Sequence, residues 1–174
     1  SALASMVGNL TVGKKKYADV EERMQAELVE LADTREHLLA LIDEDARAFG
    51  PLAAAYGMPK GSDEERAAQS AALQAALVDA CEVPLEIMAT SVQVIESCVF
   101  MARHGSVLAL SDAGAAAVLA KAALQAASLN VVINIGSMDD AERAEGYRNQ
   151  MEDLLAAGCA MADEVYADVV KRLS

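Results

Sequence analysis

The feature that most constrains this sequence is its use of small, helix-forming residues at nearly all apolar positions. Hydrophobic residues make up 54% of the chain but aromatic residues only 3%, and tryptophan is absent. The apolar content is therefore mainly alanine, leucine, valine and methionine, of which alanine, leucine and methionine strongly favour helices. The longest β-branched run is 131–133, and the chain has only three prolines. We expect an all-α fold with a core of small side chains.

Breaks in the apolar periodicity divide the chain into helical segments of a single domain spanning residues 1–174. We expect about five or six helices in one antiparallel bundle, with segments at 2–12, 17–56, 62–103, 111–135 and 137–173. Gly50-Pro51 should bend or break the second segment, and Pro84 should kink or split the third. Ser62 and Glu65 have the spacing of a capping box at the start of the third segment.

The stretch 113–138 is long enough to cross a membrane, and Lys121 is its only formally charged residue before the acidic pair at 139–140. However, polar residues at Gln125, Asn130 and Asn134 interrupt it, and no aromatic belt flanks it. We therefore predict a central buried helix and no membrane partner. Because alanine faces bury little area and allow close approach of helices, we also expect a homodimer or larger oligomer.

The charge balance and the cysteines exclude several classes of function. The formal net charge of −13 disfavours contact with nucleic acid or an anionic membrane. Three separated cysteines, Cys81, Cys98 and Cys159, and two distant histidines give no zinc spacing. We interpret the cysteines as core residues in a reducing compartment, predict a cytoplasmic protein because no secretory signal pattern is present, and expect no metal.

Four short patterns could carry chemistry. The first is Lys14-Lys15-Lys16 between Gly13 and Tyr17, which is either a solvated charge run or a site for carboxylates or phosphates. The second is the acidic run 43–45, whose first and third members lie about 200° apart on a helix. Asp43 follows two apolar residues, so it is either a carboxylate near the apolar face, with a raised pKa, or an ordinary solvated acid.

The other two patterns lie in the segment 111–135. Ser111 and Asp112 either cap that helix or place a carboxylate toward a cleft. Asn130 and Asn134 are four residues apart and project from one face of an otherwise apolar helix. Their amides need partners, which could be a bound heterocycle, a neighbouring helix or a buried water.

No P-loop, dinucleotide-binding or nucleophile-elbow motif is present in the chain. Phosphoryl transfer and cofactor-dependent redox chemistry therefore have no support. If the protein is an enzyme, we expect proton transfer and substrate positioning.

Taken together and in this order, these patterns resemble the cyclodeaminase/cyclohydrolase family of folate one-carbon enzymes. This family includes the C-terminal domain of formiminotransferase-cyclodeaminase and stand-alone methenyltetrahydrofolate cyclohydrolases. The stretches that carry the resemblance are NLTVGKKKY at 9–17, LIDEDARAF at 41–49, MPK at 58–60, VPL at 83–85, SDAG at 111–114 and NVVIN at 130–134. The chain departs from the family pattern in lacking the glycine-rich segment that usually precedes the first helix. It also has Ser106 after Gly105, whereas an asparagine commonly follows the glycine that precedes SDAG.

The resemblance implies an all-α dimer with a tetrahydrofolate substrate site near the subunit interface and no cofactor. We expect a methenyltetrahydrofolate cyclohydrolase, with formiminotetrahydrofolate cyclodeaminase as the alternative activity. A non-catalytic helical interaction module is the alternative of another class.

The resemblance to this family also implies roles for the residues of the four patterns. Asp43 and Asp112 are the expected acid/base carboxylates, and Lys15 or Lys16 donates a proton or stabilises the intermediate. The asparagines would hold the pterin or a water, and a lysine would meet the glutamate tail. The residues expected to bind substrate are Lys14, Tyr17, Ser111, Asn130 and Asn134.

Overall fold

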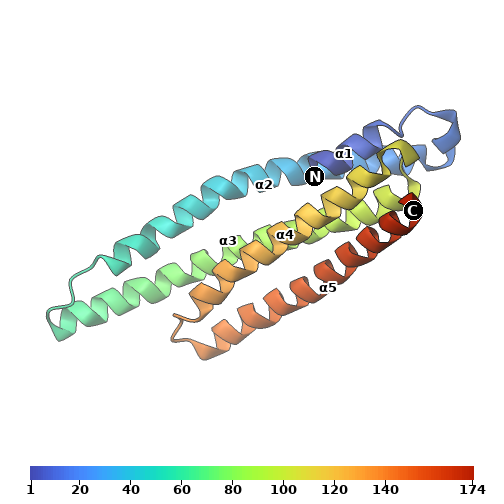
Figure 1. Cartoon of the computed structure of the whole chain (residues 1–174). Helices are drawn as coiled ribbons and strands as arrows, with labels where there is room; N and C mark the ends of the chain where they lie inside the picture. The colour runs from blue at the N-terminus through green and yellow to red at the C-terminus, as the bar shows by residue number, and fades with distance from the viewer.

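Five α-helices and two short 3-10 helices form the computed structural model, which describes residues 1–174 (Figure 1). The α-helices are α1 (Ala2–Asn9), α2 (Glu21–Tyr56), α3 (Asp63–His104), α4 (Leu110–Ile135) and α5 (Ala141–Leu173). The 3-10 helices are η1 (Lys15–Val20), which precedes α2, and η2 (Val107–Ala109), which precedes α4. With no strand present, the predicted all-α fold is confirmed, although only four of the five helices are long.

The two prolines inside helices do not end them. α2 continues through Pro51 to Tyr56, and α3 continues through Pro84 to His104. Of the alternatives expected, a break at Gly50-Pro51 and a split at Pro84 are therefore wrong, and a bend at Pro51 and a kink at Pro84 stay predictions. A proline removes one backbone hydrogen bond, but a long helix that packs along its whole length retains enough contacts to continue past it.

Local capping chemistry sets two of the helix starts. The Ser62 hydroxyl accepts a hydrogen bond from the N–H of Glu65 at 3.1 Å and the Glu65 carboxylate accepts one from the N–H of Ser62, which confirms the capping box. Asp140 caps α5 by accepting from the N–H of Arg143. The predicted cap at Ser111 and Asp112 is wrong, because η2 runs directly into α4 and both residues lie within its first turn.

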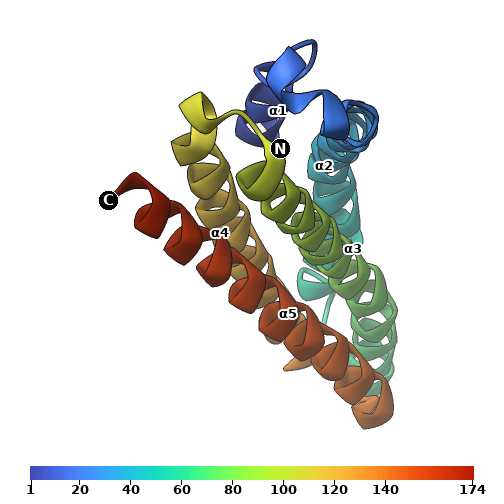
Figure 2. The ribbon, with the colours of Figure 1, turned by 90° about the vertical axis from the view of Figure 1, so that its right-hand side faces the viewer.

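Helix α3 is the centre of the bundle. It packs against α1, α2, α4 and α5, with α2 on one side and α4 and α5 on the other (Figures 1 and 2). The short α1 fills the space between α2, α3 and α4 at the end where both termini lie. Past the end of α1, helices α2 and α4 make almost no contact with each other and flank α3 as separate rods.

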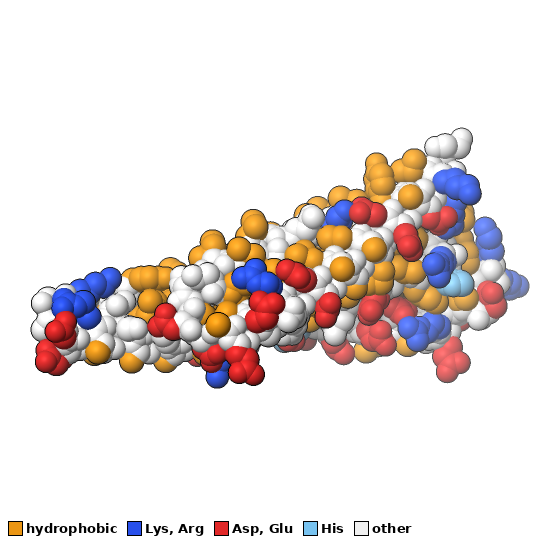
Figure 3. Space-filling model, turned by 90° about the horizontal axis from the view of Figure 1, so that it is seen from below, with side chains coloured by type: hydrophobic (Ala, Val, Ile, Leu, Met, Phe, Trp, Pro, Cys, Tyr) orange, Lys and Arg blue, Asp and Glu red, His pale blue; other side chains and the backbone are white.

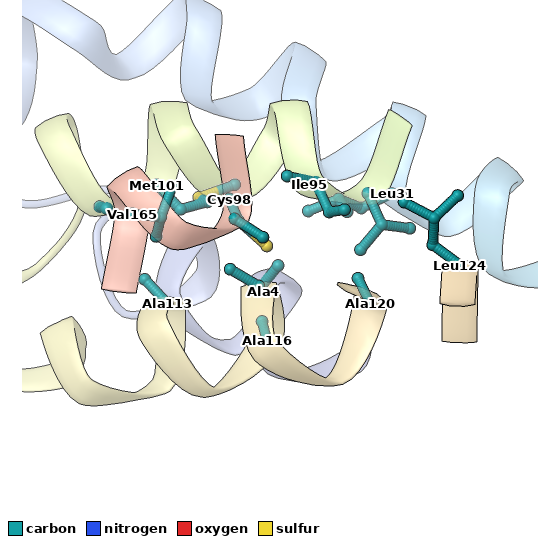
Figure 4. Packing of buried hydrophobic residues seen from close by; sticks show 14 of the residues in the cluster. Ala4, Leu31, Ile95, Cys98, Met101, Ala113, Ala116, Ala120, Leu124 and Val165 are labelled. Carbon is teal, nitrogen blue, oxygen red and sulfur yellow. The ribbon is translucent and has the colours of Figure 1, made fainter. Parts of the chain in front are cut away.

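The core consists of small and medium side chains, as the composition predicted. Fully buried alanines of α1 and α4, including Ala4, Ala113 and Ala116, face leucine, isoleucine and methionine side chains from α2 and α3 (Figure 4). Such small residues let helices approach closely. At Gly158 of α5, an added Cβ would overlap the side chain of Leu124 in α4.

Two helical stretches, α3 and 107–135, are long and apolar enough to cross a membrane by length and composition alone. The most apolar window of α3 is 61% buried inside the bundle, and that of 107–135 is 39% buried. The prediction that 113–138 forms the central helix is therefore wrong, because α3 has that position. The outer face of α4 exposes Leu119, Leu129 and Ile133 by 62%, 63% and 68%.

Acidic side chains are spread along the surface, as expected from the net charge. Figure 3 shows them along much of the length of one face, with basic side chains fewer in number. Within the bundle, no group of three or more histidine, cysteine, aspartate or glutamate side chains is placed to hold a metal ion.

Candidate functional site

A short loop and η1 carry the three consecutive lysines between α1 and α2. Gly13 has a φ of +77°, a left-handed conformation that glycine adopts at little cost. Its N–H donates a hydrogen bond to Glu21 Oε2 at 2.9 Å, which ties the loop to the first turn of α2. Lys14, Lys15 and Lys16 are exposed, and none forms an ion pair within the chain. Their ammonium groups are therefore open to an anion.

Two side chains fasten this loop to the connection between α3 and α4. Thr11 is 1% exposed, and its hydroxyl donates to Val7 O and accepts from the N–H of Ser106, both at 2.7 Å. The Tyr17 hydroxyl accepts from the N–H of Val107 at 3.2 Å. The lysines are therefore held beside the segment that leads into α4.

Tyr17 also responds electrostatically to this environment. The hydrogen bond from the backbone of Val107 lowers the pKa of Tyr17, and the charge of Lys16 acts in the same direction. The Lys16 ammonium lies 5.3 Å from the centre of the Tyr17 ring, a cation–π distance. The Tyr17 ring therefore packs against the Lys16 side chain.

Ser111 and Asp112 lie at the same end of the bundle as the lysines. Ser111 is exposed and Asp112 is half-buried. A carboxylate in the first turn of a helix is stabilised by the unpaired N–H groups and the dipole there. We call the set formed by Lys14–Tyr17, Ser111 and Asp112 the lysine end.

A second polar cluster lies in a groove between α2 and α4, on the surface of α3. The cavity in this α2–α4 groove has a volume of about 260 Å³. Helix α2 contributes an acid and two aromatic residues, α3 contributes the turn around its proline, and α4 contributes both asparagines. The lining residues are Asp45, Ala48, Phe49, Leu52, Tyr56, Ala80, Pro84, Asn130, Ile133 and Asn134.

Asp45, and not Asp43, is the carboxylate of this groove. Both acids are exposed, but Asp43 is absent from the cavity wall, whereas Asp45 lies on the wall with Leu52, seven residues further along α2. The two acids cannot share a face, so only one can line the groove. The signal for Asp45 was present in the sequence, because Leu38, Asp45 and Leu52 repeat at seven residues and Leu38 packs on the core.

The two asparagines differ in their partners. Asn134 Nδ2 donates a hydrogen bond to the backbone oxygen of Ala80 in α3 at 2.6 Å, so a neighbouring helix satisfies its amide NH₂ group. Asn130 is exposed, and its side chain forms no hydrogen bond within the chain. Both line the groove, as their spacing on one helix face predicted.

The structure thus divides the predicted site residues into two groups that do not meet within one chain. Twenty residues separate Leu110 at the start of α4 from Asn130, which corresponds to about 30 Å along a helix. Asp45 lies similarly far from the start of α2 at Glu21. The lysine end and the α2–α4 groove are therefore about 30 Å apart.

The largest cavity, about 580 Å³, lies between α2 and α3 and was not indicated by any sequence pattern. Half of its lining residues are formally charged, and they include the buried Glu27, which accepts hydrogen bonds from Arg23. The Arg23 guanidinium also lies 5.7 Å from the centre of the Phe100 ring. None of the predicted site residues lines this cavity.

Known proteins share this architecture and much of this sequence. A solved structure of formiminotetrahydrofolate cyclodeaminase from Thermotoga maritima superimposes with a TM-score of 0.78 and 32% identity, covering 98% of this chain and 79% of that one. A methenyltetrahydrofolate cyclohydrolase of Methylorubrum extorquens is 39% identical over 174 residues, which are 100% of this chain and 84% of that protein. A rat formimidoyltransferase-cyclodeaminase is 34% identical over 155 residues, and this chain spans 29% of its length.

The family model described as formiminotransferase-cyclodeaminase matches residues 1–153. The chain belongs to the formiminotransferase-cyclodeaminase family. The resemblance identified from the lysine, SDAG and NVVIN stretches is confirmed.

Proposed function

We propose that this protein is a folate one-carbon enzyme that converts 5,10-methenyltetrahydrofolate and water to 10-formyltetrahydrofolate. The observation that supports this activity most directly is the match to the Methylorubrum cyclohydrolase over the entire chain. Formiminotetrahydrofolate cyclodeaminase is the second candidate, supported by the similarity to the Thermotoga structure.

The reaction requires three proton transfers at neighbouring atoms. A base removes a proton from water as its oxygen bonds to the cationic methenyl carbon, which leaves a hydroxyl group on that carbon. The bond from the carbon to N5 then breaks, its electron pair goes to N5, and an acid supplies the proton there. The hydroxyl group loses its remaining proton as it becomes the formyl carbonyl on N10, so one proton is released overall. A positioned acid/base group is typically worth ~10²–10⁴-fold in rate.

The exposed and half-buried groups of the two clusters fit these tasks. We assign proton transfer to Asp112 with Lys15 or Lys16, because a carboxylate and ammonium groups gather at the lysine end. In the groove, we assign the role of the second catalytic carboxylate to Asp45 in place of Asp43, because Asp45 lines the cavity. The groups assigned to substrate binding are Lys14, Tyr17, Ser111, Asn130 and Asn134.

We further propose that the enzyme is a homodimer in which the lysine end of one protomer meets the groove of its partner. A two-fold axis perpendicular to the bundle, midway between the two clusters, would bring the lysine end of each protomer against the groove of its partner. The dimer would then contain two equivalent sites. Exposed apolar residues along α2 and α4 favour such a contact, and two of them, Phe49 and Ile133, line the groove. The exposed apolar residues are Val29, Leu39, Ile42 and Phe49 on α2, and Val118, Leu119, Leu129 and Ile133 on α4.

The proposal includes no cofactor and no metal, because acid/base groups suffice for the reaction. The net charge of −13 disfavours nucleic acid or an anionic membrane as a partner. We expect the protein to act in the cytoplasm on a soluble folate.

One spectrophotometric assay tests the activity, because methenyltetrahydrofolate absorbs in the near ultraviolet. Loss of that absorbance in water identifies the cyclohydrolase, whereas its appearance from the formimino compound, with release of ammonia, identifies the cyclodeaminase. Activity in neither direction, together with no heat of tetrahydrofolate binding in calorimetry, would instead favour a non-catalytic helical module.

Asp112 provides the sharpest single test of the mechanism. The Asp112→Asn variant keeps the size and a hydrogen-bond acceptor at this position but cannot exchange a proton, so we expect at least a ~100-fold loss of kcat. Unchanged turnover would remove Asp112 from the catalytic set.

A further inference from the structure

Pro84 lies in the middle of α3 and leaves one backbone oxygen without its helical partner. In an α-helix, the N–H of residue 84 would bond the carbonyl of residue 80, but proline has no N–H. The pyrrolidine ring also crowds that same carbonyl. A buried carbonyl without a donor is unfavourable, so the Ala80 oxygen needs a substitute.

Asn134 of α4 supplies this substitute donor. Its Nδ2 lies 2.6 Å from the Ala80 oxygen, across the interface of α3 and α4. Because a carbonyl can only accept, the amide must present its NH₂ group to α3. The amide oxygen Oδ1 is therefore turned the other way.

The amide oxygen is left available on the groove. Asn134 Oδ1 has no hydrogen-bond partner in the chain, and every fully buried side-chain nitrogen or oxygen does have one, so Oδ1 reaches solvent-accessible space. Asn134, Ala80 and Pro84 all line the same 260 Å³ cavity.

We propose that Pro84 is a positioning residue. By freeing the Ala80 carbonyl, it fixes the orientation of the Asn134 amide, so that the groove presents an acceptor oxygen and selects a ligand edge with an N–H donor. A free asparagine side chain can present either its oxygen or its NH₂ group. Locking it removes that ambiguity before the ligand binds.

This inference rests on the proposed function for the identity of the ligand. The pyrimidine edge of a reduced pterin carries an amino group and a ring N–H, and both are donors suited to Asn134 Oδ1. The orientation of the amide itself depends only on the chain, so it can be tested without substrate.

The test compares Pro84→Ala with Pro51→Ala. Pro51 is the matched control, because it is the other proline inside a long helix, it does not line the groove, and no side chain bonds the carbonyl four residues before it. In Pro84→Ala, the new N–H takes the Ala80 oxygen and releases the amide.

The first measurement is hydrogen exchange of the Asn134 side-chain NH₂ group by NMR in the free protein. We expect slow exchange in the wild type and in Pro51→Ala, and exchange at least tenfold faster in Pro84→Ala, with a midpoint of thermal unfolding no lower than that of the wild type. Unchanged exchange in Pro84→Ala would overturn the inference, whatever the protein binds.

The second measurement is steady-state kinetics with methenyltetrahydrofolate. Loss of one oriented hydrogen bond in both ground and transition states should raise KM about three- to tenfold in Pro84→Ala and leave kcat unchanged, while Pro51→Ala has the wild-type KM. If Asn134→Ala raises KM but Pro84→Ala does not, the positioning role of Pro84 is overturned and the proposed function stands. If neither variant alters KM, Asn134 does not bind the substrate, and the groove assignment in the proposed function fails as well.

Discussion

Asp43 and Asp45 are two residues apart on α2, but their carboxylates have different surroundings. Both are exposed, but Asp45 shares a cavity wall with two asparagines, whereas Asp43 lies on another face of the helix, away from that wall. Removing a charge next to a bound cation should affect catalysis more than removing a solvated charge.

This difference gives a prediction at the scale of the residue. Asp45→Asn should lower kcat/KM by roughly 100-fold, and Asp43→Asn by less than about threefold, in the methenyltetrahydrofolate assay. Both variants make the same chemical change on the same helix, so each controls for the other. A larger loss at Asp43 would restore the assignment made from the sequence alone.

The buried thiols of α3 make stability depend on alkaline pH. Burial raises the pKa of Cys98 from 9.0 to about 12, and that of Cys81 to about 11. From pH 9 up to about pH 11 for Cys81 and about pH 12 for Cys98, the unfolded chain loses the thiol proton and the folded chain retains it, so the unfolded state binds fewer protons. The free energy of unfolding therefore falls as pH rises through this window, by up to about 1.4 kcal/mol per pH unit for each thiol.

Chemical denaturation at a series of pH values checks this prediction. The Cys98→Ala variant should show a shallower decline in the free energy of unfolding above pH 9 than the wild type does. An identical slope in the two proteins would mean that the Cys98 thiol does not contribute to the alkaline loss of stability.

At the scale of the element, helix ends set by local chemistry could be predicted, and those set by tertiary contacts could not. The capping box of Ser62 and Glu65 involves only neighbours in sequence, and the structure confirms it. Pro84 also lies inside a helix, and α4 supplies a donor to the carbonyl that it frees. That donor is 54 residues away, and no local rule could have indicated it.

The junction between α3 and α4 shows how a small residue positions the lysine end. At Gly105, an added Cβ would lie 2.5 Å from the Met101 carbonyl oxygen and 2.5 Å from Val7 Cγ1. A backbone atom cannot yield as a flexible side chain can. The next residue, Ser106, donates the hydrogen bond that holds Thr11, so a shift here also moves the loop that carries the lysines.

Gly105→Ala should therefore destabilise the protein by about 1–3 kcal/mol and also lower activity. Gly146→Ala is the matched control, because Gly146 lies in the exposed part of α5 with nothing near its added Cβ, so this variant should be more stable by about 0.5–1 kcal/mol. Urea denaturation measures both values. Equal stabilities for the two variants would show that the junction relaxes around the extra methyl group.

At the scale of the whole molecule, the sequence indicated which stretches matter but not how far apart they lie. The lysine, SDAG and NVVIN stretches predict one site when they are read together. The structure places Asn130 about 30 Å from the start of its own helix, because α4 is straight and unbroken between SDAG and NVVIN. A shared site thus needs a second chain, which is a property of assembly and not of any segment.

Complementation between two inactive variants tests whether the site is shared. Asp112→Asn disables the lysine end, and Asp45→Asn disables the groove. If each site combines the lysine end of one protomer with the groove of its partner, a mixed dimer contains one site with both changes and one intact site. Half of the dimers formed by random exchange of equal amounts are mixed, so the mixture should recover about one quarter of the wild-type activity.

Recovery should require unfolding and refolding the two variants together, and sedimentation should show a dimer at micromolar concentration before and after. If each site lay within a single chain, co-refolding would restore nothing, because no chain in the mixture carries both intact carboxylates.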